Sequence, residues 1–424
     1  MKILFATVPA DGHFNPLTGI AMHFKHLGHD VRWYTSKTYE KKLSGMDIPL
    51  FPFVQAKEVN SENLNLIYPE VADMKGVKAI KFAWEKVFLD NIGNHFQDIN
   101  AIYQTDFRFD IFVCDAALYV MQFVAEKLKT PIYVIGPSPL TATSKDTPPN
   151  FVGLTPAKSA IGKKLYVFMR HLMDKMVFTE GMKKFNAMRT AIGLPPFTGS
   201  FWNIPFDYST LYFQSGIPEF EYKRSDLSPN VRFVGGLQPY LGKAQKNYKS
   251  IVKMDGYEKV ILVSQGTIDN KDQNKLIIPV LNALKDEPFQ LIVATGGVNT
   301  ELLREKYRRP NIIIEDYIDF RSVLPFTNLY ITNGGYGGVI LSLSFGVPML
   351  CAGITAGKND VNAHVRYFKV GIDLRTDHPS EAKIAKGVQQ ALSVEIAQNA
   401  RNLQRILSTY HPNELIEQHV FHSE

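Results

Sequence analysis

The stretch that decides the fold is LYITNGGYGGVILSLSFGVPML, which runs from Leu329 to Leu350. Its first residues form an apolar run typical of a short buried strand. The run NGGYGG (333–338) follows, and then an apolar run of helical length that ends near Gly346. Glycines let the backbone approach a ligand, and the free N–H groups of a first helical turn point toward it. The helix dipole adds about half a positive charge at this point. The stretch therefore predicts a phosphate-binding turn.

The composition is that of a large, packed protein. The chain has 424 residues, of which 45% are hydrophobic and 21% charged. This length suits two domains of about 200 residues, and these proportions argue against disorder. The net charge of +6 is mild, and Lys and Arg occur along the whole chain. A nucleic-acid surface is therefore disfavoured, and a weakly basic face that meets anionic small molecules or membrane lipids is the better interpretation.

Cysteine usage and the N-terminus suggest a location. Cys114 and Cys351 each lie inside an apolar run, which indicates buried thiols of a reducing compartment rather than a disulfide framework. The N-terminus lacks the long apolar region and the cleavage site of a signal peptide. No apolar stretch is long enough to predict a transmembrane helix. We therefore expect a cytoplasmic protein.

Short apolar runs alternate with helical patterns in both halves of the chain. The expected strands are Ile3–Val8, Asp30–Thr35, Ile111–Cys114, Ile132–Ile135 and Val231–Gly235 in the first half, and Val260–Ser264, Leu291–Ala294, Ile312–Ile314, Leu329–Thr332 and Gly371–Leu374 in the second. This βα rhythm predicts an α/β fold of two doubly wound, Rossmann-like parallel-sheet domains that face each other across a cleft. We place the N-terminal domain at 1–240, a polar linker at 241–250 and the C-terminal domain at 251–400. Residues 401–424 are expected to form a helical segment that packs back on the N-terminal domain.

Two long helical segments interrupt the first half, at about Tyr68–Tyr103 and Lys158–Ile192. Their large apolar residues include Phe82, Trp84, Phe88, Phe168, Met169, Met173, Met176 and Phe178. Core packing is one interpretation of these side chains. The other is a pocket for an apolar ligand, because Met and aromatic side chains suit adaptable pockets.

The first βα turn contains a candidate base. It reads PADGHFNP and lacks the glycine pattern of a dinucleotide site, but it places His13 at the mouth of the sheet. A His suits general-base catalysis, although a lone His often only bonds a loop carbonyl. Asp115 follows the strand Ile111–Cys114 and so lies at the same sheet edge. It is the natural partner to orient the imidazole, and helix capping is a compatible second role.

Three further strand exits in the second half are candidates for ligand contacts. Gln265, Gly266 and Thr267 form a small turn whose hydroxyl can donate to a phosphate, but the same pattern fits an ordinary turn. The sequence VATGG (293–297) is another strand-to-glycine exit. Tyr317 lies between two strands, where its ring can stack on a base or simply pack.

Taken together, these motifs resemble those of a known family. The N-terminal GHFNP and the segment EDYIDFRSVLP…YITNGGYGGVILSLSFGVPML…GKNDVNA, in this order, are similar to those of GT-B-fold glycosyltransferases of the UDP-glycosyltransferase superfamily. The likeness covers nearly the whole chain. It is closest to the bacterial branch that glycosylates small lipophilic acceptors of macrolide or flavonoid type.

The resemblance implies roles for individual residues. His13 matches the base that deprotonates the acceptor hydroxyl, and Asp115 matches the acid that supports it. On the donor side, Tyr317 matches the aromatic that stacks on the nucleobase, and Ile318 the residue whose backbone pairs with the base edge. The residues implied to hold the diphosphate are Asn333, Gly335, Gly337 and Gly338, with Ser264, Gly266 and Thr267 facing it from the first strand of the domain.

The chain departs from the family pattern at three places. Asn333 stands where the family usually has a diphosphate-binding His, so only a neutral donor is available there. Leu341 replaces an acid that often binds the ribose hydroxyls. The sugar-contacting Asp-Gln pair is replaced by sequence around Lys358 and Asp360, which become the candidates for contact with the sugar.

The resemblance implies an inverting hexosyltransferase that uses UDP-glucose by default as co-substrate. We expect no cofactor and no metal, because no pair of metal-bridging carboxylates lies near the Gly-rich turn. The expected partners are the nucleotide sugar and a small lipophilic or phenolic acceptor, with no nucleic acid and at most peripheral membrane contact. The alternatives are a lipid or sterol glycosyltransferase at the membrane surface and a catalytically silent partner of another transferase.

Overall fold

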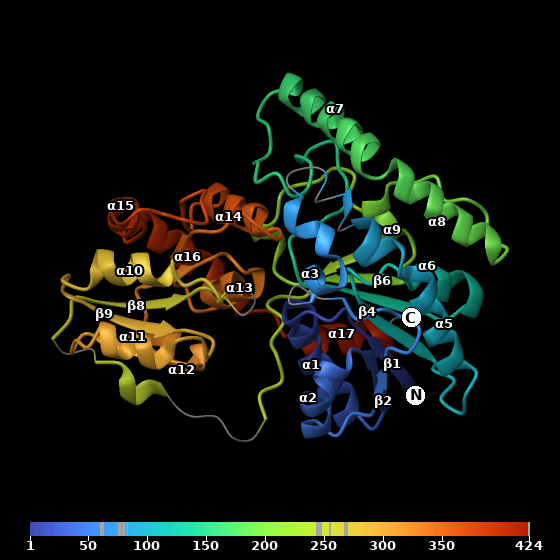
Figure 1. Ribbon diagram of the computed structural model, residues 1–424, viewed down its shortest axis with the longest axis horizontal. Helices are drawn as coiled ribbons and strands as arrows, with labels where there is room; N and C mark the ends of the chain where they lie inside the picture. The colour runs from blue at the N-terminus through green and yellow to red at the C-terminus, as the bar shows by residue number, and fades with distance from the viewer. Residues whose placement is uncertain are drawn as a thin grey trace.

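The computed structural model describes residues 1–59, 63–74, 78, 81–82, 84–242, 248–253, 256–266 and 270–422. These residues form two α/β domains, each built on one parallel sheet with helices on both faces (Figure 1). The N-terminal sheet has seven strands in the order β3-β2-β1-β4-β5-β6-β7, and the C-terminal sheet has six in the order β10-β9-β8-β11-β12-β13. The predicted pair of doubly wound domains is confirmed.

The N-terminal domain alternates strands with helices. Its strands are β1 (Lys2–Ala6), β2 (Asp30–Thr35), β3 (Leu50–Pro52), β4 (Ile111–Asp115), β5 (Ile132–Gly136), β6 (Leu211–Gln214) and β7 (Val231–Phe233). Its described helices are α1 (Asp11–His26), α2 (Glu40–Gly45), α3 (Leu64–Ile67), α5 (Ile92–Tyr103), α6 (Met121–Phe123), α7 (Ala160–Val177), α8 (Thr179–Ala191) and α9 (Ile204–Asp207).

The C-terminal domain repeats the pattern and ends in a run of helices. Its strands are β8 (Lys259–Ser264), β9 (Phe289–Ala294), β10 (Ile312–Glu315), β11 (Leu329–Thr332), β12 (Met349–Cys351) and β13 (Gly371–Asp373). The described helices are α10 (Ile277–Leu284), α11 (Thr300–Lys306), α12 (Phe320–Val323), α13 (Tyr336–Ser344), α14 (Lys358–Tyr367), α15 (Glu381–Ala391), α16 (Val394–Leu407) and α17 (Pro412–Phe421). Among the described residues, no helix is long and apolar enough to span a membrane.

The strands predicted from apolar runs are all present, within two residues at each end. Three further strands, β3, β6 and β12, were not predicted, because each is only three or four residues long and gives little periodic signal. The helical predictions were less accurate. The described part of Tyr68–Tyr103 is broken into short pieces before α5, and Lys158–Ile192 forms the two helices α7 and α8.

Both sheets are buried on both faces, and this explains the continuous apolar runs. In β1, Ile3 and Phe5 pack into one hydrophobic cluster, whereas Leu4 and Ala6 pack into another on the opposite face. Strand β8 divides in the same way between two clusters of the C-terminal domain. Alternate side chains of a strand point to opposite faces, so a strand covered by helices on both sides needs apolar residues at every position.

The last helices divide between the domains. Helix α16 packs against α13 in the C-terminal domain, whereas α17 packs against α1 of the N-terminal domain. His23 Nε2 lies 2.6 Å from Glu417 Oε2, and the ring of Phe421 meets that of Phe24 at 5.0 Å. Ile416 is buried within the N-terminal core. The end of the described chain is therefore a strap across the helix that carries His13.

The packing of α17 against the N-terminal domain can be tested through its effect on stability. The Ile416→Ala variant leaves a cavity under α17 and is expected to cost about 2–5 kcal/mol of unfolding free energy, with a lower Tm in calorimetry. Val394→Ala is the matched control, since Val394 is 82% exposed whereas Ile416 is 1% exposed. Equal Tm values for the two variants would contradict the packing of α17 described here.

Candidate functional site

His13 and Asp115 come together, although they lie far apart in the sequence. His13 Nδ1 is 3.0 Å from Asp115 Oδ1. The Asp115 side chain is fully buried, whereas that of His13 is 31% exposed. With Nδ1 directed at the carboxylate, the other ring nitrogen, Nε2, is the one available to a ligand. The pair has the arrangement of a base and the group that orients it.

The fold fixes both members of this pair. Asp115 ends β4, where Oδ2 accepts the N–H of Val8 at 2.8 Å and Oδ1 accepts the N–H of Ala117 at 2.8 Å. The carboxylate thus shapes its own turn as well as holding the imidazole. The predicted helix capping by Asp115 is wrong, because Ala116 and Ala117 form a turn and α6 begins only at Met121, with Val120 before it. His13 lies in the first turn of α1, which is anchored by the next residue: the Phe14 ring stacks on Tyr39 at 4.0 Å.

The buried carboxylate also affects its neighbours. Burial, and then the charge of Asp115, raises the pKa of the Cys114 thiol well above its ordinary value. Burial, then the charge of Asp11 and a hydrogen bond to it, and to a smaller extent the charge of Asp115, raise the pKa of the Tyr39 hydroxyl. Both groups therefore stay protonated near neutral pH.

The Gly-rich turn has the predicted strand, turn and helix. β11 ends at Thr332, and α13 begins at Tyr336 after Gly335. Gly334 has φ +90°, and a Cβ on it would lie 1.9 Å from Asn362 Oδ1, so only glycine fits there. In contrast, a Cβ on Gly335 or Gly337 would meet nothing within 4 Å. The space beside these two glycines is therefore open, which leaves room for a ligand at the start of α13.

The exit of β8 lies directly beside this turn. A Cβ on Gly266 would lie 2.9 Å from Asn333 Nδ2, and the Asn333 amide donates a hydrogen bond to the carbonyl of Gln265. Asn333 is buried, and its Oδ1 has no hydrogen-bond partner among the described residues. Ser264 Oγ accepts the N–H of Gly266 at 3.2 Å and so braces the turn. Thr267, predicted to face the phosphates, lies outside the described residues.

The residues that follow β9 and β10 lie further along the same edge of the C-terminal sheet. Tyr317 follows β10 and is 68% exposed, and its hydroxyl would lie 3.2 Å from a Cβ on Gly297, at the exit of β9. Ile318 is partly buried against the C-terminal core. The ring of Tyr317 is therefore available for stacking, and the backbone of Ile318 is held in a fixed place. Gly338, one turn into α13, packs near the Tyr330 hydroxyl, where a Cβ would lie at 3.3 Å.

Lys358 and Asp360 point to different surroundings. A Cβ added to Gly353 would lie 2.1 Å from the carbonyl oxygen of Asn333 and 3.1 Å from Lys358 Cδ. Lys358 is thus close to the Gly-rich turn. Asp360 instead accepts the N–H groups of Phe151 at 2.5 Å and Gly153 at 2.7 Å, both in the N-terminal domain. Burial raises the pKa of Asp360, and these two hydrogen bonds partly oppose it.

The Asp360 contact belongs to a seam between the domains. His364 Nε2 lies 3.1 Å from Glu221 Oε1, and its ring stacks on Tyr222 at 3.8 Å. Burial alone would raise the pKa of Glu221, but the charges of Arg224 and His364 lower it to about 2. The seam carboxylate therefore remains ionised near neutral pH.

Tyr336 joins the two sheet edges, a role that no pattern in the sequence predicts. Its buried hydroxyl donates to the Ser215 carbonyl at 2.7 Å, just beyond β6 of the N-terminal sheet. A Cβ on Gly216 would lie 2.6 Å from the same hydroxyl. The first residue of α13 therefore contacts the carboxyl edge of the other domain. Only its position within the Gly-rich run could have drawn attention to it.

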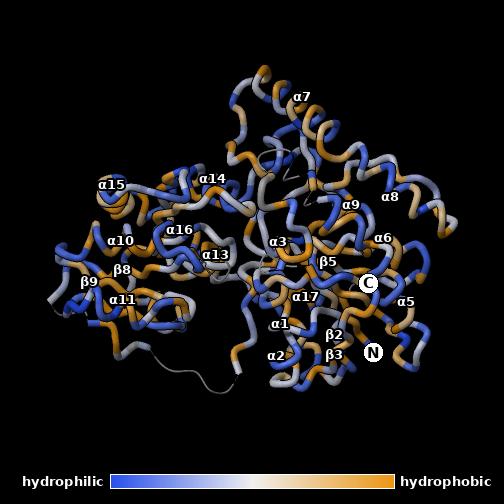
Figure 2. The backbone as a smooth tube through the Cα atoms, in the orientation of Figure 1, coloured by the Kyte–Doolittle hydropathy of each residue, from blue (hydrophilic) through white to orange (hydrophobic). Residues whose placement is uncertain are grey.

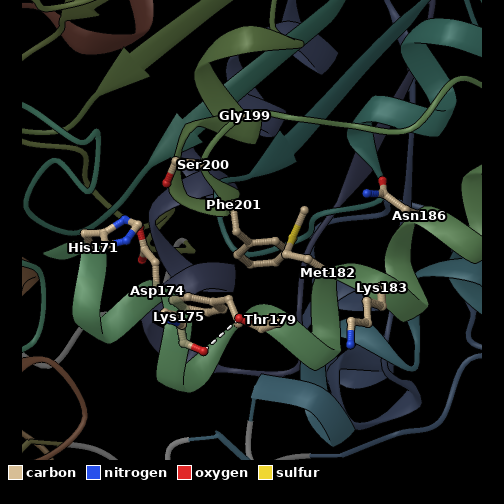
Figure 3. A pocket seen from close by; sticks show the side chains of 11 residues that line it. His171, Asp174, Lys175, Thr179, Met182, Lys183, Asn186, Gly199, Ser200 and Phe201 are labelled. Carbon is tan, nitrogen blue, oxygen red and sulfur yellow. Dashed lines mark hydrogen bonds between the residues drawn. The ribbon is translucent and has the colours of Figure 1, made fainter.

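A separate cavity of about 410 Å³ lies where α7 meets α8, beside the loop that ends at Phe201 (Figure 3). Its lining residues are His171, Asp174, Lys175, Phe178, Thr179, Met182, Lys183, Asn186, Gly199, Ser200 and Phe201. This lining includes none of the predicted site residues. Within the described parts of the chain, no cluster of three or more His, Cys, Asp or Glu side chains could hold a metal ion.

Comparisons with known proteins agree with this geometry. The chain is 31% identical over 395 residues to 4'-demethylrebeccamycin synthase of Lentzea aerocolonigenes, covering 92% of this chain and 91% of that protein. It is 25% identical to UDP-glucosyltransferase 1 of Beauveria bassiana, covering 93% and 88%. Among solved structures, the calicheamicin glycosyltransferase CalG4 superposes with a TM-score of 0.76 at 18% identity, covering 99% and 96%.

The family model described as UDP-glucoronosyl and UDP-glucosyl transferase matches residues 96–424. The two sheets, the row of strand exits and these matches lead to one assignment. The chain belongs to the UDP-glucoronosyl and UDP-glucosyl transferase family, with the GT-B fold, and is a glycosyltransferase that moves a sugar from a nucleotide sugar to a small-molecule acceptor.

Proposed function

We propose that the enzyme transfers a sugar, with glucose expected, from a UDP-sugar to a hydroxyl of a small lipophilic or phenolic acceptor, with inversion and with His13 as general base. The observation that carries the proposal is the 3.0 Å contact between His13 Nδ1 and the buried Asp115. A partly exposed imidazole held by a buried carboxylate suits the removal of a proton from a bound hydroxyl.

In this mechanism the acceptor binds to the N-terminal domain with its hydroxyl at His13 Nε2. The acceptor oxygen forms a bond to the anomeric carbon while the bond from that carbon to the diphosphate oxygen breaks. The hydroxyl proton moves to Nε2, and the electron pair of the broken bond leaves on UDP. Attack from the side opposite the leaving group converts an α-linked donor into a β-glycoside.

The donor is proposed to bind along the strand exits of the C-terminal domain. Negative charge grows on the diphosphate as it leaves, and the N–H groups of Gly335, Gly337 and Gly338 with the dipole of α13 would stabilise it. Asn333 would shape the turn through the N–H that it donates to the Gln265 carbonyl, and its second amide N–H would serve as a neutral donor to the diphosphate. Tyr317 would stack on the uracil, with the backbone of Ile318 at the base edge.

The base is tested by substitution. The His13→Ala variant is expected to lower kcat for an alcohol or weakly acidic phenol by about 10²–10⁴-fold, with UDP affinity unchanged in calorimetry. His26→Ala is the control, because His26 is an exposed residue at the end of the same helix. Near-normal turnover by His13→Ala would remove the assignment of the base.

The phosphate turn is tested by a side chain added at Gly337. Its Cβ position faces open space, so Gly337→Val should fold with a Tm no lower than that of the parent enzyme. The new side chain would occupy the place of the diphosphate and raise the Kd for UDP by about tenfold or more. Gly45→Val is the control, at another helical glycine with open space around it. Unchanged UDP affinity in the Gly337 variant would argue against the site.

The roles of Lys358 and Asp360 are tested as a pair. Asp360→Asn puts an amide where two N–H groups need acceptors, and is expected to cost about 1–3 kcal/mol of stability while the KM for the UDP-sugar changes little. Lys358→Met, beside the Gly-rich turn, should raise that KM without lowering the Tm. The reverse pattern would make Asp360 the sugar contact and Lys358 the structural residue.

A further inference from the structure

Helix α7 (Ala160–Val177) presents a row of large apolar side chains to solvent. Ile161, Leu165, Phe168, Leu172 and Met176 are each between 45% and 82% exposed. Their spacing of four, three, four and four residues places them on one face over more than four helical turns. Phe168 and Met176 are among the residues for which the sequence left core packing as one interpretation, and their exposure excludes it for these two. Figure 2 shows the hydrophobic positions along this helix, at the outer edge of the N-terminal domain.

The opposite, polar side of α7 anchors it to the protein. Lys163 Nζ lies 2.7 Å from Asp146 Oδ1, and Arg170 donates to the carbonyls of Ser144 and Thr147 at 2.8 Å each. A surface helix normally does the reverse, with its apolar face turned to the core. Because the ionic and hydrogen-bonded side faces inward, the helix does not bury the apolar row against its own domain. Exposed apolar rows of this length mark an interaction surface.

The same segment carries most of the excess charge of the chain. Residues 158–184 contain seven Lys and Arg against two Asp and Glu, a net charge of +5 out of the +6 of the whole chain. Lys164, His171 and Lys175 are exposed and recur at spacings of seven and four, so they form one edge beside the apolar row. His171 and Lys175 also line the cavity at the α7–α8 junction, together with Lys183.

We propose that α7 docks the enzyme on the surface of an anionic lipid bilayer. The apolar row would enter the boundary between headgroups and acyl chains, and the edge formed by Lys164, His171 and Lys175 would lie against lipid phosphates. A lipid surface fits better than a second copy of the chain, because pairing two α7 helices would bring together two helices that each carry four Lys and Arg against one Asp. Docking of this kind would let the enzyme take apolar acceptors from the membrane. It does not depend on the role of His13.

The test is flotation of the full-length enzyme with vesicles. Vesicles of phosphatidylcholine alone are compared with vesicles of phosphatidylcholine and phosphatidylglycerol in equal parts. Wild-type enzyme is expected to float with the anionic vesicles and to be released by salt, since screening weakens surface charge interactions. The triple variant Leu165→Ser/Phe168→Ser/Leu172→Ser should lower the partition coefficient by about tenfold or more. Lys164→Gln/Lys175→Gln should lower it only on anionic vesicles.

Matched controls separate docking from general effects. Leu302→Ser/Val394→Ser removes exposed apolar side chains elsewhere, and Lys41→Gln/Lys386→Gln removes equal charge elsewhere; both should bind as wild type does. All variants should keep turnover of a water-soluble phenol, because α7 carries none of the proposed transfer residues. Equal wild-type binding to both vesicle types, or wild-type binding by the triple variant, would overturn the proposal. Sedimentation velocity without lipid is the last check: a dimer lost in the triple variant would assign the row to a second copy instead.

Discussion

The hydrogen bond from the Tyr336 hydroxyl to the Ser215 carbonyl is the interaction on which the arrangement of the site depends. It joins the start of α13, where the Gly-rich turn ends, to the carboxyl edge of the N-terminal sheet. Burial raises the pKa of this hydroxyl well above its ordinary value, so it remains a donor. Parallel sheets present their strand exits, and therefore their ligand-binding loops, at a single edge. Contact through Tyr336 brings the two such edges of this molecule together.

A second set of contacts fixes the domains along α14. Asp360 and His364 extend from this helix to Phe151, Gly153 and Glu221 of the N-terminal domain. Buried, fully bonded charges of this kind specify one geometry rather than add much net stability. The strap formed by α17 adds a third connection, because it returns the chain to α1, the helix that carries His13. The proposed base is thus held from the sheet, through Asp115, and from the outside, through α17.

Sequence patterns were sufficient for the fold because the strands are covered on both faces and so read as short apolar runs. They were also sufficient to predict that His13 and Asp115 lie close together, because both residues follow predicted strands of one sheet. They were not sufficient where tertiary contacts decide. Nothing local indicates that Tyr336 crosses to the other domain, or that Asp360 accepts hydrogen bonds from the loop at Phe151–Gly153. The outward face of α7 was also missed, because periodicity shows that a helix is amphipathic but not which side meets the protein.

The central claim is that His13 removes the acceptor proton during transfer, and an acceptor series tests it most directly. Transfer rates of wild-type enzyme and the His13→Ala variant would be measured, at one pH, with phenols of similar shape and decreasing pKa. A base is needed only while the acceptor is protonated. The ratio of the two rates should therefore be large for weakly acidic phenols and approach one for phenols already ionised at the assay pH. A ratio that stays constant across the series would contradict the claim.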